Sequence, residues 1–151
     1  MSLPKPYYEE PGIVIYNADC RDILPYLEPV DLVLTDPPYG IAINTANATR
    51  GRGFRPYDRN CRAVDFPPVY GDDQPFDPRP LLALARIGIL WGANNFAHLL
   101  PPEAKWLAWD KKAGKAADSD LGDGELAYMW GSGKKAVRIF SHMWAGFQRD
   151  S

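Results

Sequence analysis

Histidine and cysteine, the side chains that most often bind transition metals, are scarce: the 151 residues include two of each. Cys20, Cys61, His98 and His142 show none of the spacings of metal ligands, so we expect no metal site. Two cysteines are also too few for a disulfide framework. The sequence therefore favours a reducing compartment, the cytoplasm.

Long hydrophobic runs are absent as well. No apolar stretch approaches the length of a membrane span, and residues 1–5 lack the apolar region of a signal peptide. We therefore expect a cytoplasmic protein without membrane partners. Hydrophobic residues at 46% and charged residues at 24% are ordinary for a globular protein. The length fits a single domain, 1–151, that buries a core.

A surplus of positive charge is also missing. The net charge is −2 and the isoelectric point is about 5.6, which argues against a protein coated in positive charge. A local patch can still bind nucleic acid. One lies at residues 50–62, where Asp58 is the only acid. The patch consists of Arg50, Arg52, Arg55, Arg59 and Arg62.

What the chain does contain is a succession of short apolar stretches. Residues 1–11 are expected to be an extended lead-in, and the β-branched run at 13–16 predicts a strand. Asp19 can then cap a short helix, and residues 31–35 predict a second strand. Strand, helix and strand in this order predict a right-handed βαβ unit of a parallel sheet.

The second half of the chain continues the alternation. A helix is predicted to begin with Asp77 at the N-cap and Pro78 at the first helical position. Gly131-Ser132-Gly133 suits a hairpin turn between the last two elements. Strands are predicted at 87–91, 105–109 and 136–143, with a further element at 125–130. This pattern predicts an α/β fold with a doubly wound, mostly parallel sheet and antiparallel strands near the C-terminus.

One short stretch combines a strand with unusual chemistry. Leu32–Leu34 predict a strand buried on both faces, as inside a parallel sheet. Asp36 follows at the carboxyl end of that strand, where open α/β sheets bind their ligands. Pro37 and Pro38 stiffen the loop and leave carbonyl oxygens free to accept hydrogen bonds, and Tyr39 adds a flat ring.

Asp-Pro-Pro-Tyr after an apolar strand resembles the catalytic motif of amino-methyltransferases, chiefly the phage-type DNA adenine-N6 methyltransferases. Five segments follow an order similar to the catalytic half of these enzymes, and they cover most of the chain outside 41–70: GIVIYNADCRDILPYL, DLVLTDPPYG, ILWGANNFAHLLP, KWLAWDKK and GELAYMW. The resemblance implies an S-adenosylmethionine-methyltransferase-like (Rossmann-like) fold, incomplete in this chain. It also implies double-stranded DNA as partner, as in restriction-modification, and methyl transfer from S-adenosylmethionine to a flipped adenine.

The resemblance assigns roles to individual residues. The Asp36 carboxylate and the Pro37 carbonyl would accept the N–H groups of the adenine amino group and expose its lone pair to the sulfonium methyl. Tyr39 would stack on the base. Asp19 is expected at the same sheet edge as Asp36, and both are expected beside the methyl donor. The alternative for Asp19 is a helix cap and nothing more.

The segment at about 41–76 has weak periodicity and is rich in glycine and proline, which predicts one long loop. Beside a catalytic motif, such a loop would close over DNA, and its arginines would hold phosphates. The alternative is a solvated, partly disordered loop. The two interpretations are compatible, since the loop can become ordered on DNA.

Other polar residues at the expected active edge have two interpretations each. Asn94 and Asn95 would contact donor or DNA, or cap the next helix, which is the favoured role. Asp110 and Lys111 would line the same edge or form an exposed acid–base pair.

Several related functions stay open. Asp36 favours adenine over cytosine N4 and counts against protein-glutamine methyltransferases, which usually carry Asn there. Cytosine-N4, RNA and glutamine methylation remain alternatives. Cytosine C5 chemistry needs a cysteine in a Pro-Cys loop, and neither cysteine has one.

A donor-binding motif of the type Asp-Pro-Phe-x-Gly-Ser-Gly is missing from the sequence. In family members that place the catalytic half first, the donor-binding half follows it. We therefore expect weak or no S-adenosylmethionine binding by this chain alone, with a second polypeptide or a missing C-terminal segment as partner. A truncated enzyme, a split enzyme and an inactive homologue, which would be a non-catalytic DNA-binding or assembly module, all fit.

Overall fold

The computed structural model describes residues 3–43, 67–103, 105–112, 123–131 and 136–142. Within these ranges the strands are β1 (Tyr8–Glu10), β2 (Ile13–Ile15), β3 (Val33–Thr35), β4 (Gly88–Trp91), β5 (Lys105–Asp110), β6 (Gly124–Trp130) and β7 (Val137–Ser141). The helices are α1 (Cys20–Ile23) and α2 (Arg79–Leu84), with 3₁₀ helices η1 (Leu24–Tyr26) and η2 (Ala93–Leu99). None of these helices is long and apolar enough to cross a membrane.

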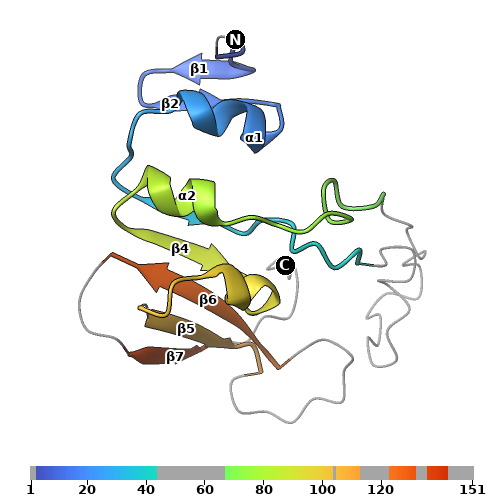
Figure 1. Ribbon diagram of the computed structural model, residues 1–151, viewed down its shortest axis with the longest axis vertical. Helices are drawn as coiled ribbons and strands as arrows, with labels where there is room; N and C mark the ends of the chain where they lie inside the picture. The colour runs from blue at the N-terminus through green and yellow to red at the C-terminus, as the bar shows by residue number, and fades with distance from the viewer. Residues whose placement is uncertain (1–2, 44–66, 104, 113–122, 132–135, 143–151) are drawn as a thin grey trace, which may run out of the picture.

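The centre of the fold is a five-stranded sheet in the order β3-β4-β6-β5-β7 (Figure 1). The pairs β3–β4 and β5–β7 are parallel, whereas β6 is antiparallel to both of its neighbours, β4 and β5. The sheet is therefore mixed, and β6 alone runs against the other four strands. The predicted α/β class is confirmed, as is antiparallel pairing near the C-terminus. Two of the four strand pairs are antiparallel, so the sheet is mixed and not mostly parallel as predicted.

The predicted hairpin across Gly131-Ser132-Gly133 is wrong. β5 lies between β6 and β7 and pairs with both, so the last two strands are not neighbours. The reason is that β6 already has β4 on one edge and β5 on the other. β7 therefore adds to the open edge of β5, where it runs parallel.

The predicted βαβ unit of residues 13–35 is also wrong. β2 pairs antiparallel with β1 in a separate two-stranded sheet and does not join the sheet of β3. The cause is local: Pro11 and Gly12 form a tight turn in which Gly12 adopts a φ of +87°. This turn folds β2 back on Tyr8–Glu10, which belong to the segment predicted to be an extended lead-in.

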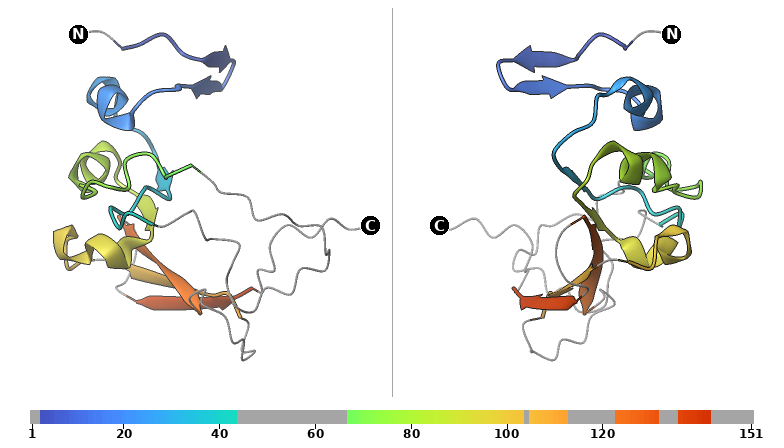
Figure 2. Two further views of the ribbon diagram at one scale, coloured as in Figure 1. Left: turned by 90° about the vertical axis from the view of Figure 1, so that its right-hand side faces the viewer. Right: turned by 60° about the vertical axis from the view of Figure 1, so that its left-hand side comes forward.

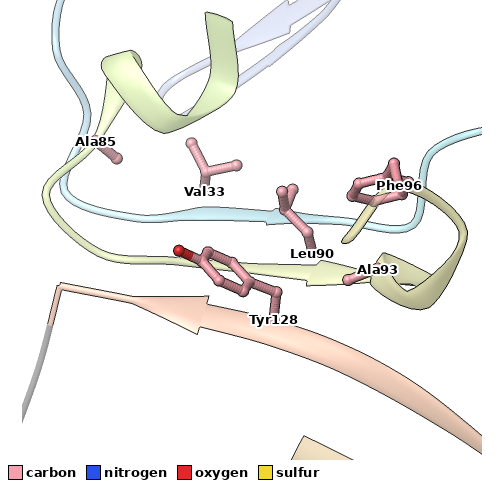
Figure 3. Packing of buried hydrophobic residues seen from close by; sticks show 6 residues of the cluster. All are labelled: Val33, Ala85, Leu90, Ala93, Phe96 and Tyr128. Carbon is pink, nitrogen blue, oxygen red and sulfur yellow. The ribbon is translucent and has the colours of Figure 1, made fainter. Parts of the chain in front are cut away.

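The core lies between one face of the sheet and the helices. Val33, Leu90 and Tyr128 come from three adjacent strands and pack with Ala85 and with two residues of η2, Ala93 and Phe96 (Figure 3). Figure 2 shows the described helices on one side of the sheet. The described residues therefore support one helical layer, and the doubly wound arrangement stays a prediction.

β3 is not the fully buried strand that the sequence predicts. Val33 is 8% exposed, but Leu32 and Leu34 are 50% and 63% exposed. Successive side chains of a strand point to opposite faces, so Leu34 points away from the layer that covers Val33. β3 also lies at the edge of the sheet formed by the described strands, none of which pairs with the other side of its backbone.

α2 begins one residue later than the sequence predicts. Pro78 is the N-cap residue, and the helix starts at Arg79. Asp77 still caps it from outside, since its Oδ1 accepts a hydrogen bond from the Arg79 amide at 3.0 Å. The Arg79 guanidinium also binds the Asp77 carboxylate, at 2.6 Å.

Candidate active site

The residues of the Asp-Pro-Pro-Tyr motif follow directly on β3, at the end of the sheet where β4 also terminates. β3 ends at Thr35 and its parallel neighbour β4 ends at Trp91, so Asp36 and Gly92 leave the same edge. Asp36 is exposed, Pro37 is buried and Tyr39 is half-buried. The position that the sequence predicts for Asp36, at the carboxyl end of a parallel strand, is the position observed.

Tyr39 is fixed against the backbone of Gly92. A Cβ atom built on Gly92 would lie 1.9 Å from Cε1 and 2.2 Å from Cζ of the tyrosine ring, so no side chain fits there. Gly92 also has a φ of +66°, a conformation that favours glycine. The turn after β4 therefore provides the surface against which the ring lies.

The hydroxyl of Tyr39 contacts the other functional group of the motif. Its Oη donates a hydrogen bond to Oδ1 of Asp36 at 2.5 Å. Burial raises the pKa of Tyr39 above its usual value, and the bond to Asp36 and the charges of Asp36, Glu125 and Asp72 raise this pKa further. Tyr39 therefore stays protonated and acts as a hydrogen-bond donor at physiological pH.

A second carboxylate, that of Asp72, anchors the chain just after the motif. Asp72 is 4% exposed, and its side chain accepts hydrogen bonds from the amides of Gly40, Ile41 and Ile43 at 2.9, 3.3 and 2.7 Å. Its own carbonyl accepts one from Ala42 at 2.8 Å. These backbone donors, that of Ile43 foremost, hold the pKa of Asp72 below its usual value.

Nothing in the sequence singles out Asp72, an acid in a stretch rich in glycine and proline. Its effect is to tie residues 40–43 to residues 69–72. The chain just before and just after the segment 44–66 is thereby held together beside Tyr39.

A pair of charges and a group of aromatic rings lie near the same edge. Lys111, which follows β5, forms an ion pair with Glu125 of β6 and lies 5.3 Å from the centre of the Trp109 ring. Trp91, Trp109 and Phe140 are in ring contact, with centroids 6.2 to 6.3 Å apart. Lys111 therefore pairs with Glu125, a partner that the sequence did not indicate.

The side chain of Asp110 accepts hydrogen bonds from residues at the same end of the sheet. Its Oδ1 accepts a hydrogen bond from the amide of Lys112, and its Oδ2 accepts one from the hydroxyl of Ser141, both at 3.0 Å. The side chain therefore joins the ends of β5 and β7.

Asp19 lies at the start of α1, away from the sheet edge where it was expected. Since β2 is outside the sheet of β3, Asp19 is not one strand from Asp36, and that prediction is wrong. Its Oδ1 accepts a hydrogen bond from the Arg21 amide at 2.9 Å, and the Arg21 guanidinium binds both carboxylate oxygens. These bonds lower the pKa of Asp19 to about 2. The geometry is that of the helix cap given above as the alternative.

Asn95 lies inside η2, whose N-cap residue is Gly92 and which has no side-chain capping bond, so the capping role favoured for Asn94 and Asn95 is wrong. Its amide nitrogen and its side-chain Nδ2 both donate to the carbonyl of Gly92, at 3.0 and 3.1 Å. Asn94 is exposed beside it.

The predicted DNA-binding arginines and the long loop stay predictions. Arg50, Arg52, Arg55, Arg59 and Arg62 lie outside the described residues, as does most of the predicted loop at 41–76. The described residues contain no group of three histidine, cysteine or acidic side chains that would hold a metal ion. No protein-family model, curated protein or solved structure matches the chain.

Proposed function

We propose that this chain is the catalytic part of a DNA adenine-N6 methyltransferase with a Rossmann-like fold. One observation carries the proposal: the Asp-Pro-Pro-Tyr motif follows a strand of an α/β sheet, with an exposed carboxylate beside a half-buried tyrosine ring. The position matches the sheet edge at which α/β folds bind ligands. Asp36, Pro37 and Tyr39 are the proposed catalytic residues.

In the proposed reaction the chain holds an adenine that has left the duplex. The Asp36 carboxylate and the Pro37 carbonyl each accept one amino N–H, which makes the nitrogen more pyramidal and frees its lone pair. That lone pair would attack the methyl carbon of S-adenosylmethionine as the carbon–sulfur bond breaks, which releases S-adenosylhomocysteine, and the nitrogen would then lose a proton to solvent. Tyr39 stacks on the base. Orientation and fixed electrostatics supply the rate enhancement.

The methyl donor is the second substrate of the proposed reaction. Asp36 would lie beside the donor because it holds the nucleophile, whereas Asp19 is bound to Arg21. The chain also lacks the glycine-rich donor motif. We propose that a second polypeptide, or a C-terminal segment of a longer protein, supplies most of the donor site.

The free edge of β3 supports such a partner. Val33 donates its amide to the Ile87 carbonyl at 3.1 Å, toward β4. The peptide groups of Leu34, the next residue, point the other way, toward the side on which none of the described strands lies. Leu32 and Leu34 expose half or more of their surface on the face opposite Val33. The edge of β3 itself suits pairing with a further strand.

DNA binding is proposed for the arginines of residues 50–62. Arginine is the side chain that binds phosphate in the most specific geometry. The support is the sequence alone, five arginines against one acid. Residues 40–43, which lead into this segment, are held beside Tyr39 by Asp72.

The absence of a donor motif in the sequence favours one second candidate, a non-catalytic DNA-binding or assembly module with the same fold. Cytosine-N4 methylation uses the same geometry of amino group and acceptors, so it is distinguished from adenine methylation by the product alone.

The test is transfer of a tritiated methyl group from S-adenosylmethionine to unmethylated DNA, followed by analysis of the methylated base. The chain is assayed alone and with the donor-binding half of a phage-type adenine methyltransferase as a separate polypeptide. We expect N6-methyladenine, and a loss of about a hundredfold or more in Asp36→Ala. Asp31→Ala, an exposed acid before β3, is the matched control and should stay active.

The outcomes separate the candidates. Binding of DNA without methyl transfer in either assay would favour the non-catalytic module. Equal transfer by the native chain and Asp36→Ala would contradict the proposed catalytic role of Asp36.

A further inference from the structure

The hydroxyl of Tyr39 has a contact that base stacking does not require. A phenylalanine ring at this position would stack on a base equally well. Yet the Tyr39 Oη donates to Oδ1 of Asp36 at 2.5 Å, and the same ring is fixed at Gly92 on its Cδ1–Cε1–Cζ edge. Ring, hydroxyl and carboxylate therefore form a chain of contacts that begins at Gly92, in the turn after β4.

This chain of contacts matters because Asp36 is exposed. An exposed aspartate can rotate about two side-chain bonds. In a misplaced orientation its carboxylate is not aligned with the amino group of the substrate. A hydrogen bond from a half-buried donor restrains one carboxylate oxygen. The other oxygen, Oδ2, then has a defined direction, and among the described residues no donor binds it.

We propose that Tyr39 is a positioning residue whose hydroxyl holds Oδ1 of Asp36, so that Oδ2 is presented to the amino group of the substrate. The role rests on the proposed function and adds to it. Gly92 supports the same arrangement, because any side chain there would displace the ring. Burial keeps Tyr39 protonated, so the hydroxyl remains a donor over the physiological range.

The first test separates the hydroxyl from the ring. Tyr39→Phe keeps the stacking surface and removes the donor, and we expect kcat to fall about 10- to 100-fold with little change in KM for DNA. Tyr39→Ala removes both and should also raise KM. Tyr7→Phe, at a tyrosine that is 76% exposed, is the matched control and should leave both constants unchanged. Native kcat in Tyr39→Phe would overturn the positioning role.

The second test needs no catalysis. Urea unfolding midpoints are measured for the native chain, Tyr39→Phe, Asp36→Ala and the double variant. If the hydroxyl binds Asp36, the two substitutions remove one shared contact, so the double variant should unfold at a higher urea concentration than the sum of the single shifts predicts. Additive shifts would overturn the inference whatever the activity.

Failure of the proposed function and failure of the positioning role would give different results. A native chain that transfers no methyl group, alone or with the donor-binding half, contradicts the proposed function, and the unfolding cycle still decides the Asp36–Tyr39 contact. An active native chain with an equally active Tyr39→Phe variant contradicts the positioning role and leaves the proposed function standing.

Discussion

Two single residues, Gly92 and Asp72, determine the shape of the candidate site without belonging to the motif. Gly92 provides the surface under Tyr39, and Asp72 binds the amides that follow it. Neither role is visible in the sequence, because each depends on a contact between segments that only the fold brings together. The motif itself was predictable, since Asp36 to Tyr39 are consecutive and follow an apolar run.

Gly92→Ala should destabilise the chain by about 2–4 kcal/mol, because a positive φ and a displaced Tyr39 ring each cost free energy. Urea unfolding measures the loss. The matched control is Gly71→Ala, which has a similar φ of +77° but whose Cβ would meet its nearest atom at an ordinary 3.7 Å. The control should lose about 1 kcal/mol. Equal losses at the two positions would show that contact with Tyr39 contributes nothing.

The lowered pKa of Asp72 predicts that the stability of the folded chain depends on pH. Its pKa is lower in the folded chain than in the unfolded chain, so the unfolded chain binds more protons as pH falls. The stabilisation is complete above about pH 4 and is lost as the pH drops through the folded-state pKa. Asp72→Asn should therefore flatten the acid limb of a plot of unfolding free energy against pH. Parallel acid limbs for variant and native chain would contradict this.

At the scale of elements, β3 shows that a run of apolar residues does not by itself indicate burial on both faces. Three consecutive apolar residues predicted a strand buried on both faces, but only Val33 is covered. The positions of β4, β5, β6 and β7 were predictable because each is a short apolar run. The strand with which each of them pairs was not predictable, because strand order depends on which strand edges are already paired. The position of β7 beside β5 is an example.

Adjacent residues of β3 should differ sharply in their contribution to stability. Val33→Ala removes two methyl groups from the core cluster and should cost about 2 kcal/mol. Leu34→Ala truncates a side chain that is 63% exposed and should cost less than about 1 kcal/mol. Thermal and urea unfolding measure both. A large loss in Leu34→Ala would mean that the side chain of Leu34 is covered in the folded protein, against its observed exposure.

At the scale of the whole molecule, the proposed affinity for DNA must come from a local patch, because the net charge is −2. If the arginines of residues 50–62 bind phosphates, five such contacts give a slope of about −4 to −5 for log K against log salt concentration. Fluorescence anisotropy with duplex DNA measures this slope. Arg52→Gln should reduce its magnitude by about one, and Arg79→Gln, which is ion-paired to Asp77, should leave it unchanged.

The hydrogen bonds of Asp72 have a consequence for how the molecule tolerates change. They bind residue 43 to residue 72, so the described residues before and after the segment 44–66 lie side by side. Lengthening a segment between pinned ends costs little, about 0.6 kcal/mol for each doubling. Exchanging residues 44–66 should therefore leave Asp36 and Tyr39 in place and, on the proposed function, alter the DNA sequence preference.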